Sequence, residues 1–180
     1  MPAEKLKKQF DVNTFSHLRF TQNLMPLLEG GKVINISSMA SFGVFPFIAP
    51  YCASKRALDI LFNSLELETN HRIKVVSVKP GVIATPLWSK SIEINSDSIN
   101  NDTTYEKEMK LMEKGARRNE QKGLPVSKVV EVVKKIDRTK NPKSSYTVGW
   151  DAFFAGIFSK LPHDVINFII EIGMKQKGMR

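Results

Sequence analysis

The chain has 180 residues, which is room for one domain of ordinary size. Hydrophobic residues make up 42% and charged residues 25% of it, which excludes wholesale disorder, a collagen-like repeat and an integral membrane protein. Basic residues outnumber acidic ones by 27 to 18, for a net charge of +9. This charge allows attraction to phosphates, acidic cofactors or anionic lipid, but its dispersal favours a solvated surface. No nucleic-acid-binding motif accompanies it, so we expect no nucleic-acid partner.

The first half of the chain predicts a helix followed by a strand–helix–strand unit. Its apolar residues recur at helical spacing in two segments and form short β-branched runs in two others. We expect, in chain order, a helix at Glu4–Leu28, a strand at Lys32–Ser38, a loop at Met39–Pro50, a helix at Tyr51–Thr69 and a strand at Ile73–Val78. A unit of this kind predicts two parallel strands joined by a crossover helix.

The second half predicts further helices and one more strand. We expect a loop at Ser89–Asn101, helices at Thr103–Lys122 and Ser127–Thr139, a turn at Asn141–Lys143, a strand at Ser145–Gly149 and an apolar helical tail at Ala152–Lys175, broken near Leu161-Pro162. Met109 and Met112 in the first of these helices either cap an apolar substrate pocket or belong to a half-solvated surface helix. The aromatic residues from Trp150 to Phe158 favour core or subunit packing, with peripheral membrane contact as the alternative.

The cysteine and histidine content narrows the chemistry. Cys52 is the single cysteine, so an intramolecular disulfide is excluded, and we expect a small buried side chain in a reducing compartment. The histidines His17, His71 and His163 stand apart, which predicts no metal site. The N-terminus carries no apolar segment after its lysines, and no apolar stretch approaches the ~18 residues that span a bilayer. We therefore expect a cytoplasmic protein.

Tyr51 and Lys55 form the first candidate for chemistry. They are four residues apart at the start of a predicted helix, so they share one helix face. A phenol is a poor acid or base at neutral pH, but a neighbouring ammonium and the positive end of the helix dipole both stabilise the phenolate. A tyrosine tuned in this way is a competent general acid–base for interconverting a carbinol and a carbonyl.

Two more features converge on the same edge of the predicted sheet. Ser38 ends the first strand and lies 51 − 38 = 13 residues before Tyr51. The segment Pro80–Pro86 leaves the carboxyl end of the next strand, and its backbone amides and the Thr85 hydroxyl suit a planar amide or a phosphate. In open parallel sheets ligands bind beyond the carboxyl ends of the strands. The coincidence of these three features favours a functional site over three independent turns.

These segments resemble the short-chain dehydrogenase/reductase family. The resemblance rests on Val33–Ser38, Tyr51–Lys55, Pro80–Pro86 and Phe10–Asn13, and Ser145–Ala152 is similar to the retinol and hydroxysteroid dehydrogenase branch. It implies a Rossmann-type α/β fold, a doubly wound parallel sheet, as one domain over residues 1–180 with a substrate lid at about 87–140. It also implies an oxidoreductase that moves a hydride between NAD or NADP and a secondary alcohol or ketone, in a homo-oligomer.

The same resemblance implies a role for each site residue. Tyr51 is the acid–base, Ser38 orients the substrate oxygen, Lys55 binds the nicotinamide ribose, and Asn13 holds a water in a relay to Lys55. The cofactor contacts are Tyr51, Lys55, Pro80, Gly81, Ile83 and Thr85, with Ile83 and Thr85 against the nicotinamide carboxamide. Ser16 stands where the family often has glycine.

One feature of the family is absent from the sequence. No Gly-x-x-x-Gly-x-Gly turn precedes Asn13, and Gly30-Gly31 leads into a strand rather than out of one. We therefore expect the C-terminal half of a dehydrogenase domain. The alternative function is a non-catalytic remnant that acts only through association with other chains.

Overall fold

The computed structural model describes residues 3–91 and 105–179. The chain divides into two compact units, one of Met1–Gly81 with Ser127–Gly156 and one of Val82–Val126 with Ile157–Arg180. The predicted loop at Ser89–Asn101 is wrong in its first residues, because residues 87–91 are helical. The rest of that loop lies outside the described residues.

The first unit contains a parallel sheet of three strands, as the sequence predicts. The strands are β1 (Lys32–Ile36), β2 (Lys74–Pro80) and β3 (Ser145–Val148), in the order β1-β2-β3. β2 pairs with both neighbours and is buried along almost its whole length. A central strand of this kind is covered on both faces and therefore needs an apolar run rather than an alternating one.

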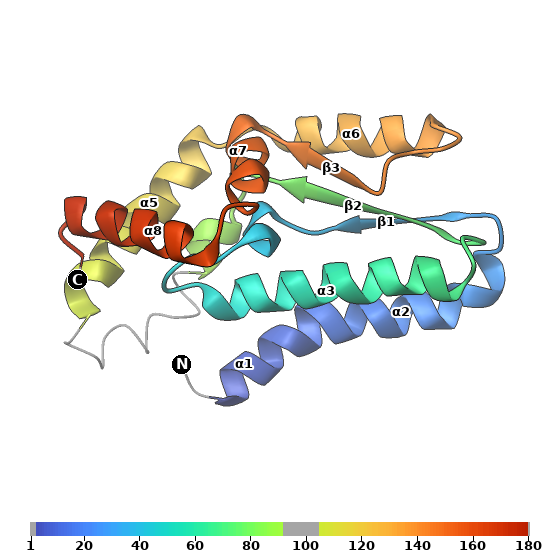
Figure 1. Cartoon of the computed structure of the whole chain (residues 1–180), viewed down its shortest axis with the longest axis horizontal. Helices are drawn as coiled ribbons and strands as arrows, with labels where there is room; N and C mark the ends of the chain where they lie inside the picture. The colour runs from blue at the N-terminus through green and yellow to red at the C-terminus, as the bar shows by residue number, and fades with distance from the viewer. Residues whose placement is uncertain (1–2, 92–104, 180) are drawn as a thin grey trace. The chain divides into compact units, whose positions relative to one another are not determined.

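Helices cover both faces of this sheet (Figure 1). On one face α3 (Ala49–Glu68) packs through Leu58 and Phe62 against Val75. On the other, α6 (Val126–Arg138) places Ile136 among residues of all three strands: Ile34, Val76, Val78, Val148 and Tyr146. The alternation follows from the period of two along a strand, and it fixes which side chains face α3.

The N-terminal helix differs from its prediction. Instead of one continuous helix over Glu4–Leu28, the structure has α1 (Ala3–Phe10), a π-helical segment η1 (Asp11–Phe15), α2 (Ser16–Leu24) and a 3₁₀ turn η2 (Met25–Leu27). A π-helical turn inserts extra backbone into the helix and shifts the face on which later residues lie. Asn13 and Thr14 lie within this segment.

Three more helices follow in the second half of the chain. α5 (Glu106–Lys122), α7 (Trp150–Phe158) and α8 (His163–Gln176) agree with the sequence, and Pro162 caps α8 at the predicted break. The prediction that the aromatic residues pack in the core is wrong for the start of α7. There Trp150, Phe153 and Phe154 form a ring cluster whose side chains are 45–76% exposed. Within residues 3–91 and 105–179, no helix is long and apolar enough to cross a membrane.

Candidate functional site

Ser38 lies just beyond the carboxyl end of β1. The strand stops at Ile36, two residues earlier than the sequence predicts, and Ser38 caps a 3₁₀ turn, η3 (Met39–Phe42). Its Oγ accepts a hydrogen bond from the backbone N–H of Ala40 at 3.1 Å. This cap fixes the Ser38 backbone at the edge of the sheet. Because Oγ acts there as an acceptor, the Ser38 O–H can still donate a hydrogen bond to another group.

Tyr51 and Lys55 lie one turn apart in the first turns of α3. The helix begins at Ala49, and Pro50 fits its first turn because a proline needs no N–H partner there. Lys55 Nζ donates to the backbone carbonyl of Ile36 at 3.2 Å, and the Tyr51 hydroxyl is hydrogen-bonded with the Ser38 side chain. The structure therefore brings Ser38, Tyr51 and Lys55 together at the carboxyl end of β1.

The ionisation of this group differs from its prediction. Burial raises the pKa of Tyr51, and the hydrogen bond with Ser38 only partly opposes that rise. Burial also lowers the pKa of Lys55, while the negative charge of Asp59 raises it. The expected fall in the pKa of Tyr51 is thus not observed, because desolvation of the phenol outweighs the stabilisation of its anion.

Asn13 contacts α3 from the π-helical segment. Its Nδ2 donates to Ser54 Oγ at 3.1 Å, and the buried Thr14 hydroxyl donates to the Ser54 carbonyl at 3.0 Å. Ser54 in turn donates to the carbonyl of Tyr51 at 2.8 Å. The asparagine is therefore fixed beside the residue that precedes Lys55, on the same turn of the helix as Tyr51.

Pro80 and Gly81 form the carboxyl end of β2. The Gly81 N–H donates to the Val148 carbonyl at 2.9 Å, which continues the pairing with β3. A Cβ at Gly81 would lie 2.0 Å from Asp151 Oδ1, so any larger residue would have to displace this side chain at the start of α7. Both residues belong to the same unit as Tyr51 and Lys55.

Ile83 and Thr85 belong to the other unit, where the backbone around Ile83 is held by the segment that follows α5. Ile83 bridges to Leu124, and the Ile83 carbonyl accepts from Trp88 Nε1 at 2.9 Å. Gly123 permits this approach, because a Cβ there would lie 2.5 Å from the backbone nitrogen of Ala84.

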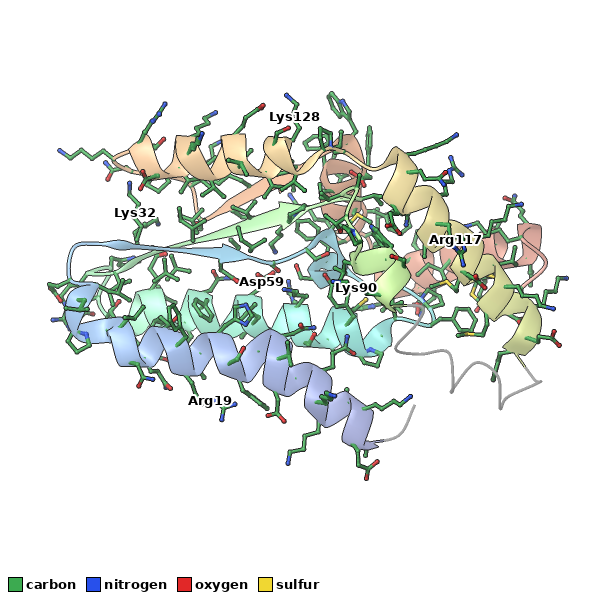
Figure 2. All side chains as sticks on the ribbon, turned by 180° about the vertical axis from the view of Figure 1, so that it is seen from behind. Arg19, Lys32, Asp59, Lys90, Arg117 and Lys128 are labelled. Carbon is green, nitrogen blue, oxygen red and sulfur yellow. The ribbon has the colours of Figure 1, made fainter. Side chains whose placement is uncertain are left out.

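A buried polar cluster behind Lys55 escaped the sequence analysis. Asp59 is 1% exposed, and its Oδ2 lies 2.8 Å from Lys79 Nζ. Its Oδ1 accepts from Ser77 Oγ at 3.1 Å and from Asn35 Nδ2 at 3.4 Å. Figure 2 shows Asp59 between α3 and the sheet. Two signals could have revealed it, an acidic residue four after Lys55 and a lysine within an otherwise apolar strand.

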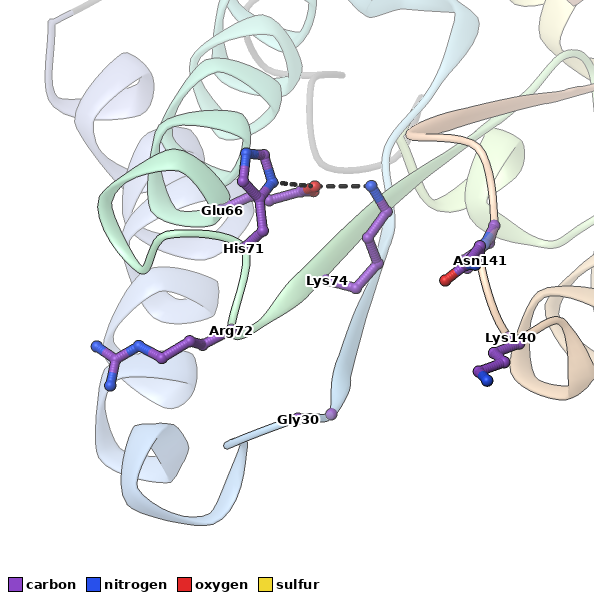
Figure 3. Close-up of a pocket in the computed structure, with 9 residues that line it drawn as sticks. Gly30, Glu66, His71, Arg72, Lys74, Lys140 and Asn141 are labelled. Carbon is purple, nitrogen blue, oxygen red and sulfur yellow. Dashed lines mark hydrogen bonds and ion pairs between the residues drawn. The ribbon is translucent and has the colours of Figure 1, made fainter.

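The described part of the chain also has a pocket of about 330 Å³ at the amino ends of the strands (Figure 3). Gly30, Lys74 and Asn141 lie just before or at the start of β1, β2 and β3 respectively. The buried Glu66 faces it and accepts from Lys74 at 2.7 Å and from His71 at 3.1 Å. The pocket therefore opens at the edge of the sheet opposite to Ser38 and Tyr51, and it forms no part of the site described above.

The chain belongs to the short-chain dehydrogenase family. The family model described as "short chain dehydrogenase" matches residues 1–95, which include Asn13, Ser38, Tyr51 and Lys55. This finding confirms the resemblance seen in the sequence.

Curated relatives agree with this assignment. An NADPH-dependent 3-dehydrocapnine reductase of Ornithobacterium rhinotracheale is 33% identical, over 82% of this chain and 54% of that protein. Human retinol dehydrogenase 16 is 30% identical, over 84% of this chain and 53% of that protein. The chain spans about half the length of the curated relatives it matches.

Solved structures support the Rossmann-type fold. A short-chain dehydrogenase from Streptomyces avermitilis superimposes with a TM-score of 0.65 and 20% identity, over 100% of this chain and 64% of the other. A short-chain dehydrogenase from Burkholderia cenocepacia, in complex with NADP, gives a TM-score of 0.65 and 20% identity, over 92% and 59%. The expected cofactor class, NAD or NADP, is that of the family to which the chain belongs, as the NADPH-dependent relative illustrates.

The residues present fit one end of such a cofactor. The Tyr51 hydroxyl and the Lys55 ammonium lie together at the carboxyl edge and match the hydroxyl groups of a nicotinamide ribose. A pyrophosphate is usually held at a helix N-terminus after a glycine-rich turn. In residues 3–91 and 105–179, the turns after β1 and β2 have no such glycine pattern.

Proposed function

We propose that this chain carries the substrate site of an NAD(P)-dependent oxidoreductase that interconverts a secondary alcohol and a ketone. The observation that carries the proposal is the convergence of Ser38, Tyr51 and Lys55 at the carboxyl end of β1. A carbonyl oxygen placed between the Ser38 and Tyr51 hydroxyls would accept two hydrogen bonds, which polarise it and orient its carbon.

Tyr51 is proposed as the proton donor for reduction. Burial keeps its phenol protonated at neutral pH, so an acid is available when negative charge develops on the substrate oxygen. Lys55 stabilises the resulting phenolate with its positive charge. Asn13, fixed against Ser54, is proposed to hold a water that returns the proton through Lys55.

Bound NADH or NADPH would supply the hydride. Lys55 and Tyr51 would bind the nicotinamide ribose, and the backbone of Pro80, Gly81 and Ile83 with the Thr85 hydroxyl would bind the carboxamide. Fixing the ring in this way would confine the reactants to one geometry and lower the entropic part of the barrier.

The substrate is proposed to be an apolar ketone or alcohol, and residues 87–140 are proposed as its lid. Met109 and Met112 of α5 are half-buried and supply adaptable apolar contacts. A homo-oligomer is proposed through α2 and α3, which expose apolar side chains in the absence of a partner: Phe20, Ile60, Leu61 and Leu67.

The reaction class is tested by isotope transfer. We would combine the 180-residue chain with the separately expressed glycine-rich half of a relative, and supply NADH or NADPH deuterated at the nicotinamide C4 with a panel of apolar ketones. A product alcohol that carries the deuterium on its carbinol carbon supports the proposal. Association of the two halves without any transfer would favour the non-catalytic alternative.

A further inference from the structure

Asp59 and Lys79 form a buried ion pair in the first unit, and Asp59 lies one helical turn beyond Lys55 of the candidate site. Tyr51, Lys55 and Asp59 recur every four residues in α3, so they follow one face of that helix. Lys55 is bound to the Ile36 carbonyl of β1, and Asp59 is bound to Ser77 and Lys79 of β2. The buried Asp59 carboxylate is therefore paired with Lys79 and lies one helical turn from Lys55, where its negative charge raises the pKa of that lysine.

Donor groups surround the Asp59 carboxylate. Lys79 is also held over the ring of Phe42, 4.3 Å from the ring centre, and its side chain is 9% exposed. Asn35 turns its amide N–H toward Asp59 and leaves its own Oδ1 without a hydrogen-bond partner among the described residues. Leaving the Asn35 carbonyl buried and unpaired costs free energy, but this orientation of the amide gives the Asp59 carboxylate a hydrogen-bond donor.

We propose that Asp59 is a positioning residue, which keeps Lys55 protonated and directed to the carboxyl edge of the sheet, with Lys79 competing for the same carboxylate. Its role in catalysis rests on the function proposed above. A protonated Lys55 is required both for binding a ribose hydroxyl and for stabilising a Tyr51 phenolate. Without Asp59, burial would favour the neutral amine.

The titratable groups of this cluster and its neighbours come from three elements. Tyr51 and Asp59 share its helix, Lys79 faces the cluster from β2, and His17 faces Lys55 from α2, where the ammonium contributes to the lowered pKa of that histidine. Among these four groups Asp59 is the carboxylate, and it is ion-paired with Lys79. The direction of any change in Lys55 therefore depends chiefly on Asp59 and Lys79.

The test reads the ionisation of Lys55 directly in the 180-residue chain. Trace acetylation with acetic anhydride at a series of pH values, followed by peptide mass spectrometry, gives a reactivity profile for each lysine. Asp59→Asn should move the Lys55 profile to lower pH, and its reactivity at neutral pH should rise about tenfold for each unit of pKa lost. Lys79→Met should move it to higher pH, because Asp59 then serves Lys55 alone.

The matched control is Glu66→Gln, which removes another buried carboxylate from the same helix, 66 − 55 = 11 residues beyond Lys55. It should leave the Lys55 profile unchanged. If Asp59 had only a structural role, Asp59→Asn and Lys79→Met would shift the reactivity profile of Lys55 in the same direction, or would leave it unchanged. Either result would overturn the proposal. If Asp59→Asn fails to fold, the sign seen in Lys79→Met decides. Because no turnover is measured, a missing dehydrogenase activity cannot be mistaken for failure of this role.

Discussion

The contact between Gly81 and Asp151 allows a stability effect to be worked out from the structure. In Gly81→Ala the new methyl would lie 2.0–2.3 Å from the carboxylate atoms of Asp151, so that side chain must move. Its movement breaks the 2.9 Å hydrogen bond from the Ala152 N–H, worth about 0.5–1.5 kcal/mol. It also withdraws a negative charge from the first turn of α7, worth about 0.3–1 kcal/mol. We expect Gly81→Ala to lower the free energy of unfolding by about 1–2.5 kcal/mol.

The effect of Gly81→Ala on the free energy of unfolding should change sign when the Asp151 carboxylate is absent. Gly81 does not have a positive φ, so alanine fits its backbone, and in an Asp151→Ala background it should stabilise the chain by about 0.4–1 kcal/mol. The coupling energy in this double-mutant cycle is then about 1.5–3.5 kcal/mol. Urea unfolding followed by circular dichroism gives the free energy of unfolding of the parent chain, the two single variants and the double variant. An equal effect of Gly81→Ala in both backgrounds would refute the close approach of β2 to α7.

Three further predictions concern pH, assembly and binding. Burial raises the pKa of Glu66, but hydrogen bonds from Lys74, Val75 and His71 lower it by more, so the pKa lies below its ordinary value of 4.5. The ionised Glu66 therefore stabilises the fold at neutral pH, and this stabilisation is lost as the carboxylate is protonated in acid. Glu66→Gln should make the free energy of unfolding fall less steeply with decreasing pH, and an unchanged pH dependence would contradict this. Leu61→Glu should reduce the mass seen by light scattering, whereas Asn63→Glu on the same helix should not; equal masses would exclude this face as the interface. Calorimetry of the 180-residue chain with NADH or NADPH should show no tight binding, and a monomer with micromolar affinity would show that the pyrophosphate needs no glycine-rich turn here.

The layered fold could be predicted from local patterns alone. Short β-branched runs gave β1, β2 and β3, and the helical spacing around Leu58 and Phe62 gave α3, because burial against a sheet requires those periods. The π-helical segment at Asp11–Phe15 could not be predicted in this way. Its apolar residues satisfy the ordinary helical period, and the insertion is stabilised by contacts of Asn13 and Thr14 with Ser54, 40 or more residues away.

The site was predicted where its residues follow a fixed spacing, and missed where they meet through tertiary packing. Tyr51 and Lys55 share a helix face by their spacing, and Ser38 joins them because strand ends meet at one edge. The raised pKa of Tyr51 was not foreseen, since the sequence shows the neighbouring charge but not the extent of burial. The ion pair of Asp59 with Lys79 joins a helix to a strand 20 residues later, and only the packed structure places them together.

The role of Tyr51 as the proton donor is the central claim, and one substitution tests it most directly. Tyr51→Phe keeps the ring and removes the hydroxyl, whereas Tyr146→Phe makes the same change on β3, where the hydroxyl accepts from the Lys143 N–H. Ketone-dependent consumption of NADPH or NADH is measured for each chain combined with a glycine-rich half. We predict a fall in kcat of about 10²–10⁴ for Tyr51→Phe and none for Tyr146→Phe. Near-normal turnover in Tyr51→Phe would contradict the account.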